Sequence, residues 1–413
     1  MRTVGVVVEY NPFHNGHQLH LRESRAASAA EAVVAVMSGP FLQRGEPALV
    51  DKWLRAEMAL RGGCDLVLEL PVAYATQAAE WFAYGAMATL EATGVVDSVC
   101  FGSESGDLKA LQCIARTLAD EPPAFRSELR QLLQRGLQYP AAYSEAVVRY
   151  MRAIGEPEAA AFPLAQPNNT LGLHYMLALE RLGSPILPLT IRRQKAGYHE
   201  QQPQDSRIAS ATALRRMLES GAALDELAPY VPATTLQLLQ TAATEPGGCR
   251  SWPDYFPQLL HALLTHTPDS LFAIREMNEG LEHRILHALP RLKTLGYEEL
   301  VQAVATRRYT RTKLQRALLA VLLGQQKHAQ TPDMLRSGVD YIRVLGFNAT
   351  GRRLLRRMRT TASLPILLSA ARAPEGLRYL ELDVRASAIY AAAPKNATTG
   401  ELYRDFYAAP IQI

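Results

Sequence analysis

Short apolar runs alternate with helical patterns in the first part of this chain, and this alternation restricts its fold more than any other feature. It predicts an α/β fold in which helices cover both faces of a parallel, Rossmann-like sheet. Gly, Pro or Asp bounds each run, as expected at strand ends. The predicted strands are Thr3–Glu9, Ala32–Met37, Asp65–Leu70, Ser98–Gly102 and Pro185–Ile191. Residues 119–160 are expected to form a helical insertion before the last strand.

The second part of the chain predicts a mostly α-helical domain. A stretch rich in Gly and Pro, TEPGGCRSWPDY, indicates a boundary near residue 245 and therefore two domains, 1–245 and 246–413. Helical patterns follow in YFPQLLHALLTH, TKLQRALLAVLLG, TPDMLRSGVDYIRVLGF and GRRLLRRMR. Near the end, RYLELDVRASAIYAA is expected to contain a short strand.

Composition restricts the class of protein further. With 48% hydrophobic and 20% charged residues the chain is expected to be globular, and no apolar run reaches the ~20 residues of a membrane helix. The first residues lack the pattern of a secretion signal. The four cysteines lack C-x-x-C spacing, which favours a reducing compartment over disulfides or a zinc site. These features predict a cytoplasmic protein without membrane contact, and the sequence indicates no obligatory protein partner.

Three histidines stand in the turn after the first predicted strand, in VGVVVEYNPFHNGHQLHL. A strand, a turn and a helix form the place where open α/β sheets bind nucleotides, because helix N-termini favour phosphate. Gly16 allows close approach of the backbone, and His14 and His17 fall on one face of the first helical turn. Imidazoles there can donate to phosphate oxygens and stabilise a leaving pyrophosphate. His14 and His17 are therefore the predicted catalytic residues.

Other interpretations of these histidines stay open. Spacing of three residues between His14, His17 and His20 could serve a metal, although helical zinc pairs are spaced by four. The rings could also cap and solvate the start of a helix, and His20 could simply be packed. No metal ligand set is predicted.

A basic block lies in the second part of the chain. Between Val301 and Thr360, 13 Lys or Arg residues stand against two acids, a net charge of +11, which leaves −7 for the rest of a chain whose total is +4. Such a block indicates a polyanion-binding surface, and an exposed Tyr309 could stack on an unpaired base. The alternative is a solubilising helix face. The predicted RNA-binding cations are Arg307, Arg308, Arg311, Lys313, Arg352, Arg353, Arg356 and Arg357.

Two separated motifs resemble the nucleotidyltransferase superfamily. His14-Asn15-Gly16-His17 matches its H-x-G-H signature, and IASATALR resembles its I-S-S-T-x-I-R segment, which holds the β and γ phosphates of ATP. The matching positions predict phosphate-binding roles for Ser210, Thr212 and Arg215. Ala209 and Ala211 replace some of the hydroxyls, so backbone amides are expected to contribute more there.

Longer phrases resemble one bacterial family, the tRNA(Met) cytidine acetate ligases, over essentially the whole chain. They are VVEYNPFHNGH, SGPFLQRGEPALVDKWLRAEMALRGGCDLVLELP, FGSESGD, PNNTLGLHY, QKAGYH, RYTRTKLQRALLAVLLG and YIRVLGFN. The resemblance implies that acetate attacks the α-phosphate of ATP and forms acetyl-adenylate. The exocyclic amine of the wobble cytidine of elongator tRNA(Met) then takes the acetyl group, which gives N4-acetylcytidine. Mg²⁺ is expected to accompany the ATP.

The resemblance also implies an ATP site. Its residues are Val7, Val8, Glu9, Tyr10, Asn11, Pro12, Phe13, His14, Asn15, Gly16, His17, Gln18, Leu19, His20, Gly102, Asn168, Arg193 and Gln194. Taken alone, Gly102 could be a plain turn glycine and Asn168 a helix cap. The arginine site has near rivals within residues 192–195, and Asp51, Lys52 and Glu104 are weaker substrate-side candidates.

Two rival functions remain. An adenylyltransferase acting on a phosphorylated cofactor precursor would share both motifs, but it would not explain the basic helical domain. A non-catalytic RNA-binding module would explain that domain, but not the retention of both motifs.

Overall fold

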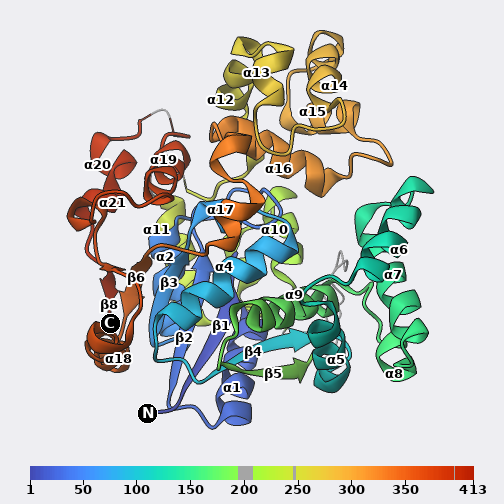
Figure 1. Ribbon diagram of the computed structural model, residues 1–413. Coiled ribbons are helices and arrows are strands. Elements are labelled where there is room, and N and C mark those ends of the chain that lie inside the picture. Colours follow the sequence, from blue (N-terminus) through green and yellow to red (C-terminus); the bar gives the residue numbers. More distant parts are fainter. Residues whose placement is uncertain (194–207, 245–247, 395) are drawn as a thin grey trace.

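The computed structural model describes residues 1–193, 208–244, 248–394 and 396–413, and within them one central sheet (Figure 1). Its strands are ordered β5-β4-β1-β2-β3-β6-β7, and β8 pairs with β6. The first five strands pair in parallel and lie within two residues of their predicted bounds. They are β1 (Thr3–Val8), β2 (Ala32–Ser38), β3 (Leu66–Leu70), β4 (Ser98–Ser103) and β5 (Leu187–Arg192). The predicted parallel α/β sheet is thus confirmed.

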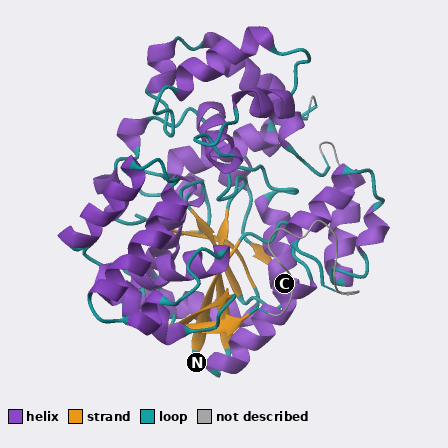
Figure 2. Ribbon diagram, turned by 90° about the vertical axis from the view of Figure 1, so that its right-hand side faces the viewer, coloured by secondary structure: helices purple, strands orange, loops and turns teal. Residues whose placement is uncertain are grey.

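Helices cover both faces of this sheet, because alternate residues of its strands point to opposite sides. Along β2, Val34 and Val36 join one apolar core, while Val33, Ala35 and Met37 join the other. The first core lies under α3 (Val72–Ala75), α4 (Ala79–Ala92), α5 (Leu108–Leu118) and α9 (Pro167–Leu182). The second lies under α1 (Asn15–Ser28), α2 (Lys52–Arg61), α10 (Ala211–Glu219) and α11 (Ala233–Thr244). Figure 2 shows the strands surrounded by helices.

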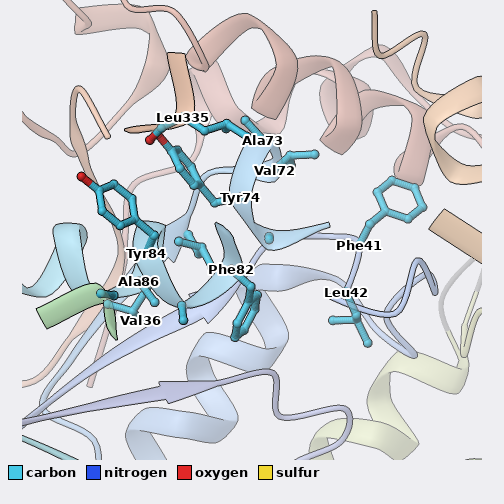
Figure 3. Close-up of a cluster of buried hydrophobic side chains, with 14 of the residues drawn as sticks. Val36, Phe41, Leu42, Val72, Ala73, Tyr74, Phe82, Tyr84, Ala86 and Leu335 are labelled. Atoms are coloured by element: carbon cyan, nitrogen blue, oxygen red, sulfur yellow. The ribbon is translucent and has the colours of Figure 1, made fainter. Parts of the chain in front are cut away.

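The first core extends beyond the sheet into the second part of the chain (Figure 3). The hydroxyl of Tyr74 donates to the backbone carbonyl of Leu335 at 2.9 Å, and that of Tyr84 donates to the carbonyl of Arg336 at 2.7 Å. Both rings are buried, so each polar tip needs such a partner. These bonds fix α17 (Pro332–Arg336) against α3 and α4.

One predicted helix is a strand. YIRVLGF forms β6 (Ile342–Phe347), which pairs antiparallel with β3 and extends the sheet with β7 (Ile366–Leu367) and β8 (Ile411–Gln412). All six residues of β6 are buried, including Arg343, whose guanidinium lies 3.2 Å from the carboxylate of Asp405. The helical prediction failed because this charge interrupts the apolar run that would have indicated a buried strand.

One predicted strand is a helix. RYLELDVRASAIYAA forms α19 (Leu380–Ala391), in which the buried residues Leu382, Ala386 and Tyr390 are four positions apart. This spacing puts them on one helical face, and the prediction gave too much weight to β-branched and aromatic residues.

The other predicted helical regions are helical. The insertion forms α6 (Pro123–Gln134), α7 (Tyr139–Ala153) and α8 (Pro157–Ala160), and the helical part continues with α12 (Trp252–Thr265), α13 (Pro268–Phe272), α14 (Leu281–Ala288), α15 (Tyr297–Val304) and α16 (Arg311–Leu322). The C-terminal region adds α18 (Ala349–Thr361), α20 (Thr399–Leu402) and α21 (Arg404–Tyr407). In Figure 1, α12–α16 lie beyond one end of the sheet and α18 lies near the other. The boundary predicted near residue 245 coincides with residues outside the described part. Among the helices that are described, none is both long and apolar enough to span a bilayer.

Candidate functional site

The turn between β1 and α1 presents two stacked imidazoles at the start of a helix. His14 is the N-cap residue of α1, and its backbone N–H donates to Nδ1 of His17 at 3.2 Å. The two rings stack with 3.6 Å between their centroids. The capping interpretation is therefore right in part, because the ring of His17 caps the helix start while it faces the neighbouring ring.

Both rings are neutral at pH 7. Burial lowers the pKa of His14 to about 3, and the positive charge of Arg193 adds to this. Burial, then His14, then Arg193 lower the pKa of His17 well below its usual value, and burial lowers the pKa of His20 to about 4. Because Nδ1 of neutral His17 accepts a hydrogen bond, its hydrogen is on Nε2. His17 can thus donate through Nε2 to an anionic ligand.

Gly16 makes the stacking possible. A Cβ atom at this position would lie 2.9 Å from Cε1 and 3.0 Å from Nδ1 of His14, so any side chain would displace that ring. The glycine of the H-x-G-H motif is required here for space beside the histidine.

A second wall of the site comes from the start of α10. Ser210 is the N-cap residue, and its hydroxyl oxygen accepts from the backbone N–H of Ala213 at 3.2 Å, which leaves the hydroxyl hydrogen available for donation. Arg215 donates from one terminal nitrogen to the carbonyl of Asn11 at 2.9 Å and from the other to Glu46 at 2.9 Å. The predicted phosphate-binding segment therefore packs directly against the histidine turn.

A third wall joins the ends of β4 and β5 to α9. A Cβ atom at Gly102 would lie 3.0 Å from Cγ of Arg193, so this glycine makes room for the arginine and is more than a turn residue. Arg193 donates to the side-chain oxygen of Asn168 at 3.1 Å. The alternative in which Asn168 is itself the cap does not hold, because Glu104 accepts from the backbone N–H groups of Asn168 and Asn169 at 3.1 and 2.8 Å. A remote carboxylate caps α9.

These three walls line one cavity of about 290 Å³. The predicted ligand-binding residues that line it are Val7, Val8, Glu9, Tyr10, Asn11, His14, Gly16, His17, Leu19, His20, Gly102, Asn168, Arg193, Ser210, Thr212 and Arg215. Pro12, Phe13, Asn15 and Gln18 do not line it, and the side-chain amide of Asn15 donates instead to the carbonyl of Pro229 at 3.0 Å. Gln194 lies outside the described residues.

The cavity offers groups that suit a ligand with several negative charges. The N-termini of α1 and α10 adjoin it, and Arg193 and Arg215 line it. Three buried side-chain nitrogens of lining residues have no hydrogen-bond partner among the described residues, namely Asn11 Nδ2, His14 Nδ1 and His20 Nε2. Buried polar atoms are rarely left unpaired, so these atoms point to a bound polar ligand.

The described residues contain no group of three or more His, Cys, Asp or Glu side chains arranged to hold a metal ion. Lys52 and Asp51, two of the weaker substrate-side candidates, instead stabilise the fold. Nζ of Lys52 is buried 2.8 Å from both Glu69 and Asp405, and Asp51 accepts from the backbone N–H of Leu54 as the N-cap of α2.

Sequence reasoning gave no role to Arg44 and Glu46, both of which line the cavity. They belong to the β2–α2 loop, defined as residues 39–51. A signal was present, because QRGE places opposite charges beside a glycine within an otherwise apolar segment. Their approach to the histidine turn depends on the tertiary fold.

The first group of predicted RNA-binding cations lies around the start of α16, and acids pair with most of it. Glu279 lies 3.1 Å from both Arg308 and Lys313, and Glu298 lies 2.7 Å from Arg311. Both acids precede the basic block in sequence, so counting charge within the block overstated its excess. Tyr309 is not exposed as expected: it is 7% exposed, and its hydroxyl donates to the carbonyl of Glu279.

The second group, Arg352, Arg353, Arg356 and Arg357, lies on the exposed face of α18, whose buried face contains Leu354 and Met358. Asn348, the N-cap of α18, donates to the carboxylate of Asp65 just before β3 at 2.9 Å. This contact places α18 at the amino ends of the parallel strands, whereas the cavity lies at their carboxyl ends. The two predicted cation groups are therefore at opposite ends of the sheet (Figure 1).

Comparison with known proteins agrees with this architecture. A family model described as HIGH nucleotidyl transferase matches residues 1–405. A tRNA(Met) cytidine acetate ligase of Acetivibrio thermocellus is 39% identical over 98% of both chains, and one of Syntrophotalea carbinolica is 40% identical over 100% of this chain and 99% of its own.

Two crystal structures of TmcAL from Thermotoga maritima share the fold. The apo form has a TM-score of 0.92 at 35% identity and covers 100% of both chains. The form bound with alpha-thio ATP has a TM-score of 0.90 at 34% identity, with 100% of this chain and 99% of the other covered. By its whole length and its motifs, the chain belongs to the tRNA(Met) cytidine acetate ligase family of the HIGH nucleotidyl transferases.

Proposed function

We propose that this protein is an ATP-dependent ligase that acetylates the wobble cytidine of elongator tRNA(Met). One observation carries the proposal: the H-x-G-H turn, the start of α10 and the Gly102–Arg193–Asn168 wall meet in a single cavity. The curated relatives named as acetate ligases and the related structure bound with alpha-thio ATP support it. We also expect the protein to act in the cytoplasm.

In the proposed reaction, an oxygen of acetate attacks the α-phosphorus of ATP and pyrophosphate leaves. Nε2 of His17 donates to the phosphate oxygens as charge moves toward the pyrophosphate. Arg215, Ser210, Thr212 and the N-terminus of α10 bind the β and γ phosphates. Such a reaction depends on positioning and on charge stabilisation, so no protein nucleophile is needed.

The adenine and ribose lie, in this proposal, along the wall made by Gly102, Asn168 and Arg193. Mg²⁺ bound together with the ATP would neutralise part of the charge of the phosphates. The cytidine amine then attacks the acetyl carbon and AMP leaves. To reach the adenylate, the base has to be turned out of its loop.

The test is exchange of labelled pyrophosphate into ATP, with and without acetate, followed by addition of total tRNA. We expect acetate-dependent exchange and then N4-acetylcytidine in elongator tRNA(Met). Exchange that ignores acetate but responds to a phosphorylated small molecule would favour the cofactor adenylyltransferase instead. No exchange, together with tight tRNA binding, would contradict an enzyme function.

The His14→Ala and His17→Ala variants locate the chemistry. Each should abolish exchange because each removes a group at the phosphates, while tRNA affinity should stay within about twofold because RNA contacts lie elsewhere. Loss of tRNA affinity in parallel with exchange would indicate misfolding or a shared site, and thermal unfolding would distinguish the two.

A further inference from the structure

The β2–α2 loop connects the cavity to the helical part of the molecule. Arg44 and Glu46 of this loop line the cavity, while Gly45 between them touches α16. Gly45 has a φ of +77°, and a Cβ atom there would lie 2.5 Å from the backbone nitrogen of Arg316. The indole nitrogen of Trp252 in α12 also donates to the carbonyl of Gly45 at 3.1 Å. The loop is thus fixed by two helices of the second part of the chain.

Glu46 bridges these helices and the cavity. Its Oε2 accepts from a terminal nitrogen of Arg215 at 2.9 Å, and its Oε1 accepts from the side-chain amide of Gln315 in α16 at 3.2 Å. Gln315 is 4% exposed, and the side chains of Arg215 and Glu46 are 18% and 26% exposed. Partial burial strengthens such bonds, because water competes less for the partners.

The bridge leaves Arg215 able to bind an anion. A guanidinium has five N–H groups, and Arg215 uses one toward Asn11 and one toward Glu46. The two acceptors fix the plane of the guanidinium and leave its remaining N–H groups for a phosphate. Holding the side chain in advance lowers the entropy lost when ATP binds.

We propose that Glu46 and Gln315 are positioning residues that orient Arg215 toward the triphosphate, so that α16 is part of the ATP site. The proposal rests on the role proposed above for Arg215. Neither residue needs to touch the substrate, because Gln315 orients Glu46 and Glu46 orients Arg215.

The test measures the ATP dissociation constant by calorimetry, without acetate or tRNA, for Glu46→Gln, Gln315→Met and the double variant. Glu46→Gln should weaken ATP binding about tenfold, since a charge-assisted bond is removed, and Gln315→Met about threefold. The double variant should match Glu46→Gln, because Gln315 acts through Glu46. In pyrophosphate exchange, the KM for ATP should rise while kcat changes less than about twofold.

The control is Gln302→Met, which changes an exposed glutamine on α15 of the same helical part and should leave ATP affinity unchanged. If Gln315→Met lowers the unfolding temperature, Gln315→Asn replaces it, because the shorter amide stays polar but does not reach Glu46. Rescue of ATP affinity by Gln315→Asn would contradict the proposal.

Three further outcomes would overturn the proposal. The first is an unchanged ATP affinity in Gln315→Met, and the second is a double variant whose loss of ATP affinity equals the product of the two single losses. The third is tighter ATP binding by Glu46→Gln, which would mean that the carboxylate repels the triphosphate. Failure of the proposed function can be distinguished from failure of this inference. If the wild-type protein binds ATP but does not acetylate tRNA, the acetylation proposal is wrong, and the ATP-binding measurements still test the roles of Glu46 and Gln315. A wild-type protein that does not bind ATP would overturn both.

Discussion

Space around single residues decides the geometry of the histidine turn. The two imidazoles stack 3.6 Å apart at the start of α1 because Gly16 has no side chain to displace His14. Gly102 plays the matching part for Arg193 on the opposite wall of the cavity. At both positions the missing Cβ atom gives room to a polar side chain that lines the cavity.

Gly16→Ala should therefore reduce acetate-dependent pyrophosphate exchange by about tenfold or more, because a shift of about 1 Å in a positioned group has a large effect on rate. The unfolding temperature should change little, since alanine favours helices. Gly400→Ala is the control, because its Cβ atom would meet only Oγ1 of Thr398 at 3.9 Å. Equal exchange in wild type and Gly16→Ala would contradict the role given to this glycine.

The buried histidines also predict a pH dependence of stability. Burial lowers the pKa of His14 to about 3 and that of His20 to about 4, whereas unfolded histidines titrate near 6.5. Between these pH values the unfolded chain binds more protons than the folded chain. The contribution of these histidines to the free energy of unfolding is therefore fully present above pH 6.5 and is lost as the pH falls toward 4.

Urea unfolding of wild type and His20→Gln from pH 7 to pH 4.5 measures this dependence. The variant should lose less stability over that range. His174, whose pKa burial also lowers to about 4, contributes the same slope in both proteins and cancels in the comparison. Identical slopes would show that His20 is accessible to protons in the folded state.

Helix starts organise the site at the scale of elements. The N-termini of α1, α9 and α10 adjoin one cavity, and each has a different device at its start: a histidine pair, the distant carboxylate of Glu104, and the hydroxyl of Ser210. Glu104 is the most informative, because it holds Asn168 and, through it, Arg193. This cap therefore also positions two residues that line the cavity.

Glu104→Gln should lower the free energy of unfolding by about 1 kcal/mol. The amide has one acceptor oxygen where the carboxylate has two, and the amide carries no negative charge to interact with the positive end of the helix dipole. The substitution should also raise the KM for ATP, since Asn168 and Arg193 lose their support. Urea unfolding and pyrophosphate exchange measure the two effects, with the exposed Glu375→Gln as control. A stability loss without a change in KM would limit Glu104 to a structural role.

Strands from both the first and the second part of the chain form one sheet, which joins the two parts. β6 pairs with β3, and Asp405 near the C-terminus lies against Lys52 and Arg343 in a buried ion cluster. The helical part is held to the sheet through α17 and through the β2–α2 loop. The cavity and the cations at the start of α16 are therefore placed by one framework, with α18 at its far end.

Replacing Arg352, Arg353, Arg356 and Arg357 together by Gln should weaken tRNA binding and flatten its salt dependence by about 0.7 to 0.9 for each phosphate that these cations neutralise in the wild type. Acetate-dependent exchange should stay unchanged, because α18 is at the opposite end of the sheet from the cavity. Salt titrations of tRNA affinity measure the first effect. An unchanged salt slope would mean that the arginines of α18 face solvent and do not contact tRNA. Replacing Arg307, Arg308, Arg311 and Lys313 by Gln would then show whether the cations at the start of α16 bind tRNA without α18.

Patterns among residues that are close in sequence predicted much of the fold and of the candidate site. The strands β1 to β4 are mostly buried on both faces, so they are largely apolar and visible in the sequence, whereas the edge strand β5 is partly exposed. The H-x-G-H turn and the α10 segment are short, and their motifs lie within a few residues. The predictions failed at Arg343, Tyr309 and Leu380–Ala391, where partners from distant segments decide burial or helical packing.

The sequence by itself determined the parallel sheet, through the periodicity of its apolar runs, and its motifs and longer phrases carried the resemblance to the family, because both depend on neighbours along the chain. Only the tertiary structure decided that Glu46 bridges Arg215 and Gln315, that Glu104 caps α9, and that the acids Glu279 and Glu298 pair with the basic block. The reason is physical: a hydrogen bond or an ion pair needs its two atoms about 3 Å apart, and for groups separated by tens or hundreds of residues the packing of the whole chain sets that distance.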